Sequence, residues 1–347
     1  GFSDGTKDGG YLMANWSIYK AKEELTMISR KHNVKVIFFD GRGGPPARGG
    51  GKTHQFYASL GPTIENEEIQ LTIQGQTISS NFGTIDSSQY NLEQLISSGL
   101  SNQIFDGSLN RLSDEEREIM SQLADKSYKA YSDFKSHPKF LAYLENMSTL
   151  KYYAKTNIGS RPSKRKSSET LNFSDLRAIP FVGSWSQLKQ NVPGFYGVGS
   201  ALQHFEEEGR FEEVVSLYNG SKFFKSLIDN SMMSMKKSFF DLTRYMQSDP
   251  EFGEFWELIF EEFTNTRRLV LKLANQKELM QNYPVAKASI EVREEIVLPL
   301  LTIQQYALKK VKDLEGDAAS GTVSKEIYEK IITRSLFGNI NASRNSA

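Results

Sequence analysis

An apolar run followed at once by a glycine-rich loop constrains this chain more than any other feature of its sequence. Residues 34–39, Val-Lys-Val-Ile-Phe-Phe, predict a buried strand. Residues 41–51 then read Gly-Arg-Gly-Gly-Pro-Pro-Ala-Arg-Gly-Gly-Gly, which places Arg42 and Arg48 on a backbone that is mostly glycine. Such a loop can present bare N–H groups and two guanidinium groups to an anion, because glycine permits close approach and arginine matches phosphate and carboxylate geometry. The alternatives are a flexible linker and an Arg-Gly-Gly segment that contacts RNA.

Further strands and helices alternate along the first half of the chain. Residues 68–73 predict a second strand and residues 178–183 a third, although Pro180 is unfavourable inside a strand. Residues 11–31 predict a helix, and strands separated by helical stretches indicate parallel βα units. One apolar stripe on that helix recurs at steps of four and three: Ala14, Ile18, Ala21, Leu25 and Ile28.

Most of the remaining sequence is typical of helices. Residues 114–150, 220–275 and 286–315 show a period of 3.6 residues, with Pro299 as an expected kink. Residues 155–172 are polar and basic without periodicity, which predicts a loop.

Composition excludes several classes of function. Lysine plus arginine and aspartate plus glutamate both number 42, and a formal charge of zero argues against a dedicated nucleic-acid binder. The chain has no cysteine, which excludes disulfides and thiolate metal sites and fits a reducing cytoplasm. The longest apolar run, residues 296–301, is too short to span a membrane, so we expect no membrane partner.

Three segments, in the same order, resemble the phosphoenolpyruvate carboxylase family. Residues 1–10 match the family segment Gly-Tyr-Ser-Asp-Ser-x-Lys-Asp. The loop 41–51, with the residues before it, matches Phe-His-Gly-Arg-Gly-Gly-x-x-Gly-Arg-Gly-Gly. Residues 175–181 match Leu-Arg-Ala-Ile-Pro-Trp. Residues 72–75, 159–162 and 344–345 are also similar. The resemblance runs along the whole chain, but family members are more than twice as long. It therefore implies the C-terminal part of such an enzyme, with the missing N-terminal half as a partner.

The resemblance implies an α/β fold that is predominantly α-helical. Residues 1–190 would form the C-terminal half of a (β/α)8 TIM-type barrel, including a truncated strand at Gly1, and residues 191–347 a large helical region. In such barrels functional groups lie at the C-terminal ends of the strands.

The family converts phosphoenolpyruvate and bicarbonate to oxaloacetate and phosphate through carboxyphosphate and an enolate, an anaplerotic step. It uses Mg2+ or Mn2+ and no biotin, and its members are homo-oligomers, which implies a tetramer here. The second metal ligand, a glutamate, and a catalytic histidine would lie upstream of Gly1, so we expect this part alone to be inactive.

Individual residues match the family's catalytic positions. Asp4 matches a metal-binding aspartate, although an aspartate there could simply cap a helix. Lys7 matches an active-site lysine, and Arg42 and Arg177 match arginines that hold the substrate phosphate. Arg48 matches the second arginine of a mobile loop. Fixed cations and a metal suit this chemistry, because charge moves onto phosphoryl and enolate oxygens.

Other residues complete the implied substrate site or depart from the family pattern. Arg161, Gly43 and Gly44 are the further substrate-binding residues that the resemblance implies. Asp40 stands where the family usually has histidine. A carboxylate beside a phosphate site is unfavourable unless it pairs with Arg42 or contacts a metal.

A second set of residues matches the family's inhibitor site for aspartate or malate. The set comprises Arg48, Lys237, Arg293 and Asn345. Cations and an amide are a plausible cage for a dicarboxylate, although Lys237 could instead lie on a solvated helix face. Two other functions stay open: an Arg-Gly-Gly nucleic-acid module and a purely regulatory or assembly domain.

Overall fold

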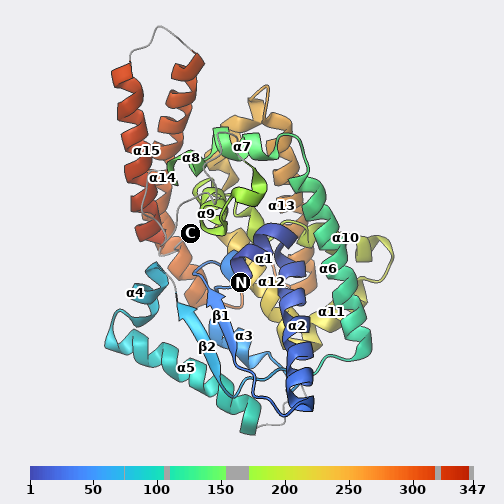
Figure 1. The fold of residues 1–347 in the computed structure, drawn as a ribbon. Helices are drawn as coiled ribbons and strands as arrows, with labels where there is room; N and C mark the ends of the chain where they lie inside the picture. Colours follow the sequence, from blue (N-terminus) through green and yellow to red (C-terminus); the bar gives the residue numbers. More distant parts are fainter. Residues whose placement is uncertain (74, 105–109, 154–171, 317–321, 344–347) are drawn as a thin grey trace.

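A small parallel sheet lies at one end of a mostly helical molecule (Figure 1). The structure is a computed structural model that describes residues 1–73, 75–104, 110–153, 172–316 and 322–343. In these ranges two strands pair in parallel, β1 (Phe38–Arg42) and β2 (Ile69–Ile73), with Arg42 opposite Ile73. No helix within these ranges has the length and apolar character needed to cross a membrane.

Helices account for most of the other described residues. The α-helices are α1 (Phe2–Gly9), α2 (Tyr11–Lys31), α3 (Thr53–Ala58), α4 (Gln76–Phe82), α5 (Ile85–Ile104), α6 (Asp114–Lys135), α7 (Phe140–Met147), α8 (Leu150–Tyr153), α9 (Ala178–Gln187), α10 (Val198–Glu207), α11 (Phe211–Gly220), α12 (Lys222–Lys236), α13 (Gly253–Ala274), α14 (Pro284–Gly316) and α15 (Thr322–Ser343). The 3-10 turns are η1 (Pro46–Arg48), η3 (Phe173–Asp175), η4 (Val192–Gly194) and η5 (Phe240–Ser248).

The helix predicted over residues 11–31 is confirmed as α2, but its buried face differs from the predicted stripe. Leu25 and Ile28 are 51% and 44% exposed. The buried face instead carries Tyr11, Trp16 and Tyr19. Aromatic side chains bury more apolar area than alanine or isoleucine, and they outweigh the stripe in choosing the packed face.

The prediction of a strand at residues 178–183 is wrong, because this segment begins the helix α9. Arg177 is the extended N-cap residue, so Pro180 falls in the first turn. Proline is tolerated there, since the N–H that it lacks would have no partner within the helix. The segment after Gly1 is likewise the helix α1 and not the end of a strand.

The strand predicted at residues 34–39 begins later, at Phe38, and continues into the loop as far as Arg42. The strand predicted at 68–73 is confirmed as β2. With two strands in the described part of the chain, the fold is α/β and predominantly helical, and the half barrel is not seen. The predicted polar loop at residues 155–172 falls almost entirely outside the described residues.

Aromatic side chains fill the centre of the helical body. Phe134 of α6 stacks on Phe255 of α13 with ring centroids 5.2 Å apart, and Trp185 of α9 lies 6.1 Å from Phe134. Such pairs contribute about 0.5–1.5 kcal/mol each beyond area burial. The same core includes Phe2 near the start of the chain and Met280 far along it, so it joins the α1–β1 region to α9–α13.

The two longest late helices form an antiparallel pair that extends from the body at the upper left of Figure 1. A separate apolar cluster holds them together, with Ala307 of α14 and Ile332 and Leu336 of α15 fully buried. Pro299 lies inside α14, and the helix continues on both sides of it.

Candidate functional site

The glycine-rich loop folds back on itself after β1. Its backbone N–H groups donate within the loop: Gly43 to the Arg48 carbonyl at 2.8 Å, Gly50 to the Pro45 carbonyl at 3.0 Å and Gly51 to the Gly44 carbonyl at 3.2 Å. These three N–H groups are therefore not bare, which corrects the expectation that the loop offers them to an anion.

Two positions in this loop require glycine: Gly50, which lies against the backbone of the loop itself, and Gly51, which lies against α12. A Cβ on Gly50 would lie 1.9 Å from the Gly44 carbonyl oxygen. Gly51 has φ of +85°, and a Cβ there would lie 2.3 Å from the side-chain oxygen of Asn230. A larger residue at Gly50 would open the loop itself, and a larger residue at Gly51 would push the loop away from α12.

Arg42, the last residue of β1, is buried and incompletely hydrogen-bonded. It is 5% exposed, and its Nε and Nη1 have no hydrogen-bond partner among the described residues. The guanidinium lies 4.2 Å from the ring centroid of Phe56 and 4.8 Å from that of Phe2. Burial lowers the pKa of Arg42, with opposing contributions from Tyr57 and Asp40. Buried donors normally have partners. Neither atom is open to solvent in this structure, so an external acceptor would reach these N–H groups only when the surrounding side chains move.

Arg42 is among the residues that line a cavity at the C-terminal ends of β1 and β2. We call it the Arg42 cavity; its lining includes Arg42, Gly43, Gly51, Lys52, Thr53, His54, Leu71, Thr72, Ile73 and, from α4 and α5, Thr77, Asn81, Phe82, Tyr90, Asn91 and Leu95. Burial lowers the pKa of Lys52, and burial together with the Lys52 charge lowers that of His54. Sequence reasoning missed Lys52 and His54, although both directly follow the glycine block.

Asp40 pairs with a different cation from the one we expected. Its Oδ2 atom lies 2.6 Å from Lys22 Nζ and accepts a hydrogen bond of 2.7 Å from the Tyr57 hydroxyl. Burial lowers the pKa of Lys22, and Asp40 opposes that shift. The carboxylate is thus neutralised by Lys22 on α2.

Arg48 points toward α1. It is 1% exposed, and its Nε donates to Ser3 Oγ at 3.2 Å. Burial lowers the pKa of Arg48 to about 10, with Tyr153 and Asp4 acting in the opposite direction. Arg48 is not among the residues that line the Arg42 cavity.

The remaining predicted catalytic residues lie around α1 and α9. Lys7 is buried, with Nζ 2.6 Å from Asp8 Oδ1 and 4.1 Å from the Phe173 ring centroid. Asp4 is exposed in the first turn of α1, whose N-cap is Gly1, so it is not the cap residue. Arg177 is half-buried at the start of α9, and its Nε has no hydrogen-bond partner in the described part of the chain.

No group of three potential metal ligands occurs among the described residues. Asp4 therefore belongs to no such group of ligands within the described ranges. Arg161 and Asn345 lie outside the described residues.

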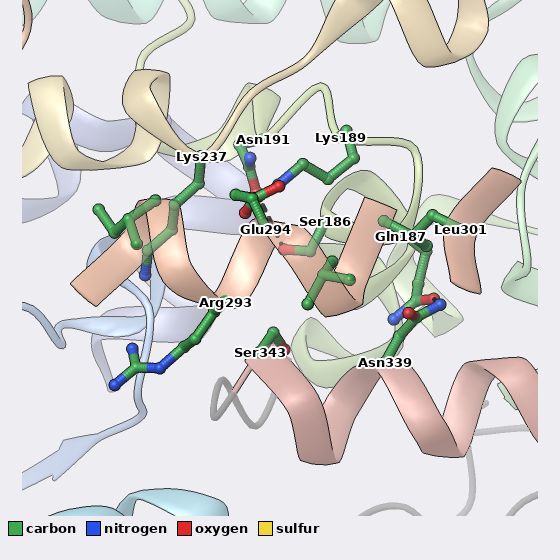
Figure 2. A pocket seen from close by; sticks show the side chains of 12 residues that line it. Ser186, Gln187, Lys189, Asn191, Lys237, Arg293, Glu294, Leu301, Asn339 and Ser343 are labelled. Carbon is green, nitrogen blue, oxygen red and sulfur yellow. Dashed lines mark hydrogen bonds and ion pairs between the residues drawn. The ribbon is translucent and has the colours of Figure 1, made fainter. Parts of the chain in front are cut away.

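A second cavity, the Lys237 cavity, lies between α14, α15 and the segment after α9 (Figure 2). Its lining includes Ser186, Gln187, Lys189, Asn191, Lys237, Ile290, Arg293, Glu294, Val297, Leu301, Asn339 and Ser343. Two of the four predicted effector residues, Lys237 and Arg293, thus line one cavity, whereas Arg48 is not among its lining residues.

Charge in the Lys237 cavity is partly balanced. Lys189 and Glu294 form an ion pair of 2.6 Å, and Asn339 donates to Gln187 at 3.2 Å. Burial, with the charges of Lys189 and Arg293, lowers the pKa of Lys237 to about 8. Nothing in the sequence marks Lys189 or Glu294, because only the packing of α14 against the turn after α9 brings them together.

The fold and the cavities describe a mostly helical protein with a buried arginine at the carboxyl end of a parallel strand. Comparison with known proteins identifies the class: the chain belongs to the phosphoenolpyruvate carboxylase family, whose model matches residues 1–343. A curated relative, the phosphoenolpyruvate carboxylase of Corynebacterium diphtheriae, is 34% identical over 357 residues. The match covers 100% of this chain and 38% of that relative, so the chain spans well under half of the relative's length.

Proposed function

We propose that this chain forms the phosphate-binding part of an enzyme that carboxylates phosphoenolpyruvate with bicarbonate to give oxaloacetate and phosphate. Family membership supports the proposal. The single observation that carries it is the buried guanidinium of Arg42, whose Nε and Nη1 have no partner among the described residues and which lines a cavity. A phosphoryl group is a suitable acceptor for a pair of arginine N–H groups.

In the proposed reaction, bicarbonate oxygen attacks the substrate phosphorus, which forms carboxyphosphate and leaves the enolate of pyruvate. The enolate carbon then attacks the carboxyl carbon and releases phosphate. Arg42 would bind the phosphoryl oxygens. Arg177 and Lys7 are not among the residues that line the Arg42 cavity, and they would act on the phosphoryl and enolate charge from α9 and α1, which pack on each other. Cations that are fixed before reaction stabilise such charge with little reorganisation.

Mg2+ or Mn2+ would supply further charge stabilisation in the family's reaction. The described residues offer Asp4 as one exposed carboxylate and no group of three ligands. They do not by themselves fit a divalent cation, and each step above therefore rests on this chain's own cations.

We further propose that Lys237 and Arg293 bind a dicarboxylate inhibitor, aspartate or malate. Both line one cavity, and a dianion would offset the repulsion between them. Arg48 would join the site only if the glycine-rich loop left α1, and Asn345, which lies outside the described residues, is proposed as the fourth member. A homo-oligomer, the division at residue 190 and a cytoplasmic location stay proposals of the same kind.

The burial of Arg42 and Arg48 disfavours the alternative of an Arg-Gly-Gly nucleic-acid contact. Backbone phosphate contacts need accessible cations, and these side chains are 5% and 1% exposed. The proposed function is tested by assaying oxaloacetate formation from phosphoenolpyruvate and bicarbonate with the intact parent enzyme. Turnover that depends on both substrates supports it, and a pure parent enzyme without such turnover contradicts it.

A further inference from the structure

A buried ion pair lies directly beside the Arg42 guanidinium. Lys22 and Asp40 are both about 6% exposed, and their Nζ and Oδ2 atoms are 2.6 Å apart. Lys22 comes from α2, and Asp40 comes from β1. Tyr57 of α3 donates to the same Oδ2 atom, so one carboxylate joins three elements.

Asp40 is an internal competitor for Arg42, because its charge acts on the buried guanidinium. Residues two apart on a strand share a face, and Asp40 and Arg42 are both buried in the alternating pattern of β1. The ring of Tyr57 lies 5.5 Å from the Arg42 guanidinium. A carboxylate without Lys22 would gain most by turning toward Arg42, because an unpaired buried charge is costly.

The charge count in this cluster favours an external anion. Lys22 and Arg42 carry two positive charges, and Asp40 carries one negative charge. Because Lys22 and Tyr57 engage the carboxylate, the excess positive charge resides on Arg42, whose Nε and Nη1 lack partners among the described residues.

We infer that Lys22 is a positioning residue that sequesters Asp40 and so keeps Arg42 available for an oxyanion of the phosphate type. The identification of that oxyanion as the substrate phosphate rests on the proposed function. Asp40 replaces the histidine that is usual in the family motif, and it brings a negative charge to this place. Lys22 supplies the charge that cancels it.

The inference predicts opposite effects for the two halves of the ion pair. Lys22→Met leaves Asp40 to occupy Arg42, so anion affinity falls. Asp40→Asn removes the competing carboxylate and leaves two cations, so anion affinity is unchanged or higher. A role confined to holding the fold together would weaken affinity in both variants, because each breaks the same ion pair.

The test is a calorimetric titration of sulfate into the intact parent enzyme and its variants at one ionic strength. We expect about a tenfold rise in the sulfate Kd for Lys22→Met, no rise for Asp40→Asn, and a return to near the wild-type value in the double variant. Lys22→Arg retains the charge and is expected to bind like wild type. Glu23→Gln is the matched control, because it breaks the Glu23–Arg117 pair from the next residue of α2.

Equal losses in Lys22→Met and Asp40→Asn, or wild-type binding by Lys22→Met, would overturn the inference, as would a wild-type enzyme that binds no sulfate. Thermal unfolding of each variant checks that it is folded. Asp40→Asn keeps the test decisive if Lys22→Met does not fold, because the inference and a purely structural role predict different affinities for it. The proposed function has its own test: an enzyme that binds sulfate as described but does not carboxylate phosphoenolpyruvate would contradict the proposed function and leave the role of Lys22 intact.

Discussion

The Arg42 cavity and the Lys237 cavity are both cationic, but they differ in charge balance and in what surrounds them. Among the described lining residues the Arg42 cavity has no carboxylate, whereas the Lys237 cavity contains Glu294 paired with Lys189. Both linings nevertheless carry a formal net charge of +2, from Arg42 and Lys52 in one and from Lys189, Lys237 and Arg293 against Glu294 in the other. Both therefore suit an anion, and the ion pair in the second fixes part of its lining.

The surroundings differ as well. Large apolar side chains near the sheet are exposed, including Phe39 of β1 at 68% and Ile96 of α5 at 60%. The Lys237 cavity lies against fully buried residues such as Trp185 and Leu188 around α9, although α14 also exposes Val292 at 68% and Ile296 at 59% near Arg293. Exposed apolar area of this kind marks a surface that another segment of polypeptide normally covers. We expect the Arg42 cavity to need further protein that covers the sheet. We expect the Lys237 cavity to bind its ligand without that cover, because its lining comes from α9, α14, α15 and nearby described segments.

The largest expected difference concerns residues 1–347 as an isolated chain. It should form no oxaloacetate, because catalytic groups that act as one unit fail together when some are missing. Aspartate or malate should still raise its melting temperature, since a ligand that binds the folded state stabilises it. Activity assays and thermal shift on the same sample check both. Measurable turnover, or no thermal response at millimolar ligand, would break the comparison.

Arg42→Ala and Arg177→Ala in the intact parent enzyme should have the next largest effect. Loss of one fixed charge on a transferring phosphoryl group should cost about a hundredfold or more in kcat/KM. Arg42→Lys keeps the charge but not the pair of parallel N–H groups, so it should recover only part of the rate. Steady-state kinetics measure this, and a near-normal kcat/KM in either alanine variant would show that the phosphate site is assigned wrongly.

Substitution in the Lys237 cavity should spare catalysis and weaken inhibition. Lys237→Ala and Arg293→Ala should each raise the aspartate concentration for half inhibition by about tenfold, as expected when one partner of a charged contact is lost. Lys236→Ala is the matched control, because Lys236 pairs with Glu291 on the surface and does not line the cavity. If Lys236→Ala and Lys237→Ala change the aspartate concentration for half inhibition equally, the proposed dicarboxylate site is wrong.

The smallest expected effect is a pH dependence of dicarboxylate binding. The pKa of Lys237 is lowered to about 8, and only the protonated amine attracts a dianion. Affinity should therefore be highest below pH 8 and should fall as the pH rises through that value, whereas Lys237→Ala should lack this step. Calorimetric titrations between pH 7 and about pH 9 measure it. A wild-type affinity that is flat across this range would contradict the assignment.

Local patterns predicted much of the fold and only part of the sites. The period of α2 and the alternation of β2 were sufficient to place both elements, because each depends on residues close in sequence. The helix α9 was missed because the apolar run at residues 178–183 favoured a strand, although Pro180 disfavours a strand interior and suits a first helical turn.

The candidate sites depended more on long-range contacts. Lys22 lies 18 residues before its partner Asp40, and Lys189 lies 105 residues before Glu294. Neither pair has a spacing that sequence reasoning can recognise. Arg42 could be chosen from its motif, but its burial against Phe2 and Phe56 and its unpaired N–H groups are visible only in the folded chain.

The most direct test of the account is a crystal structure of the intact parent enzyme with bound inorganic phosphate. The account predicts a phosphate in the Arg42 cavity, with its oxygens within hydrogen-bonding distance of Arg42 Nε and Nη1 and with Asp40 still on Lys22. A well-defined phosphate bound elsewhere, with Arg42 still without an acceptor or turned to Asp40, would contradict it.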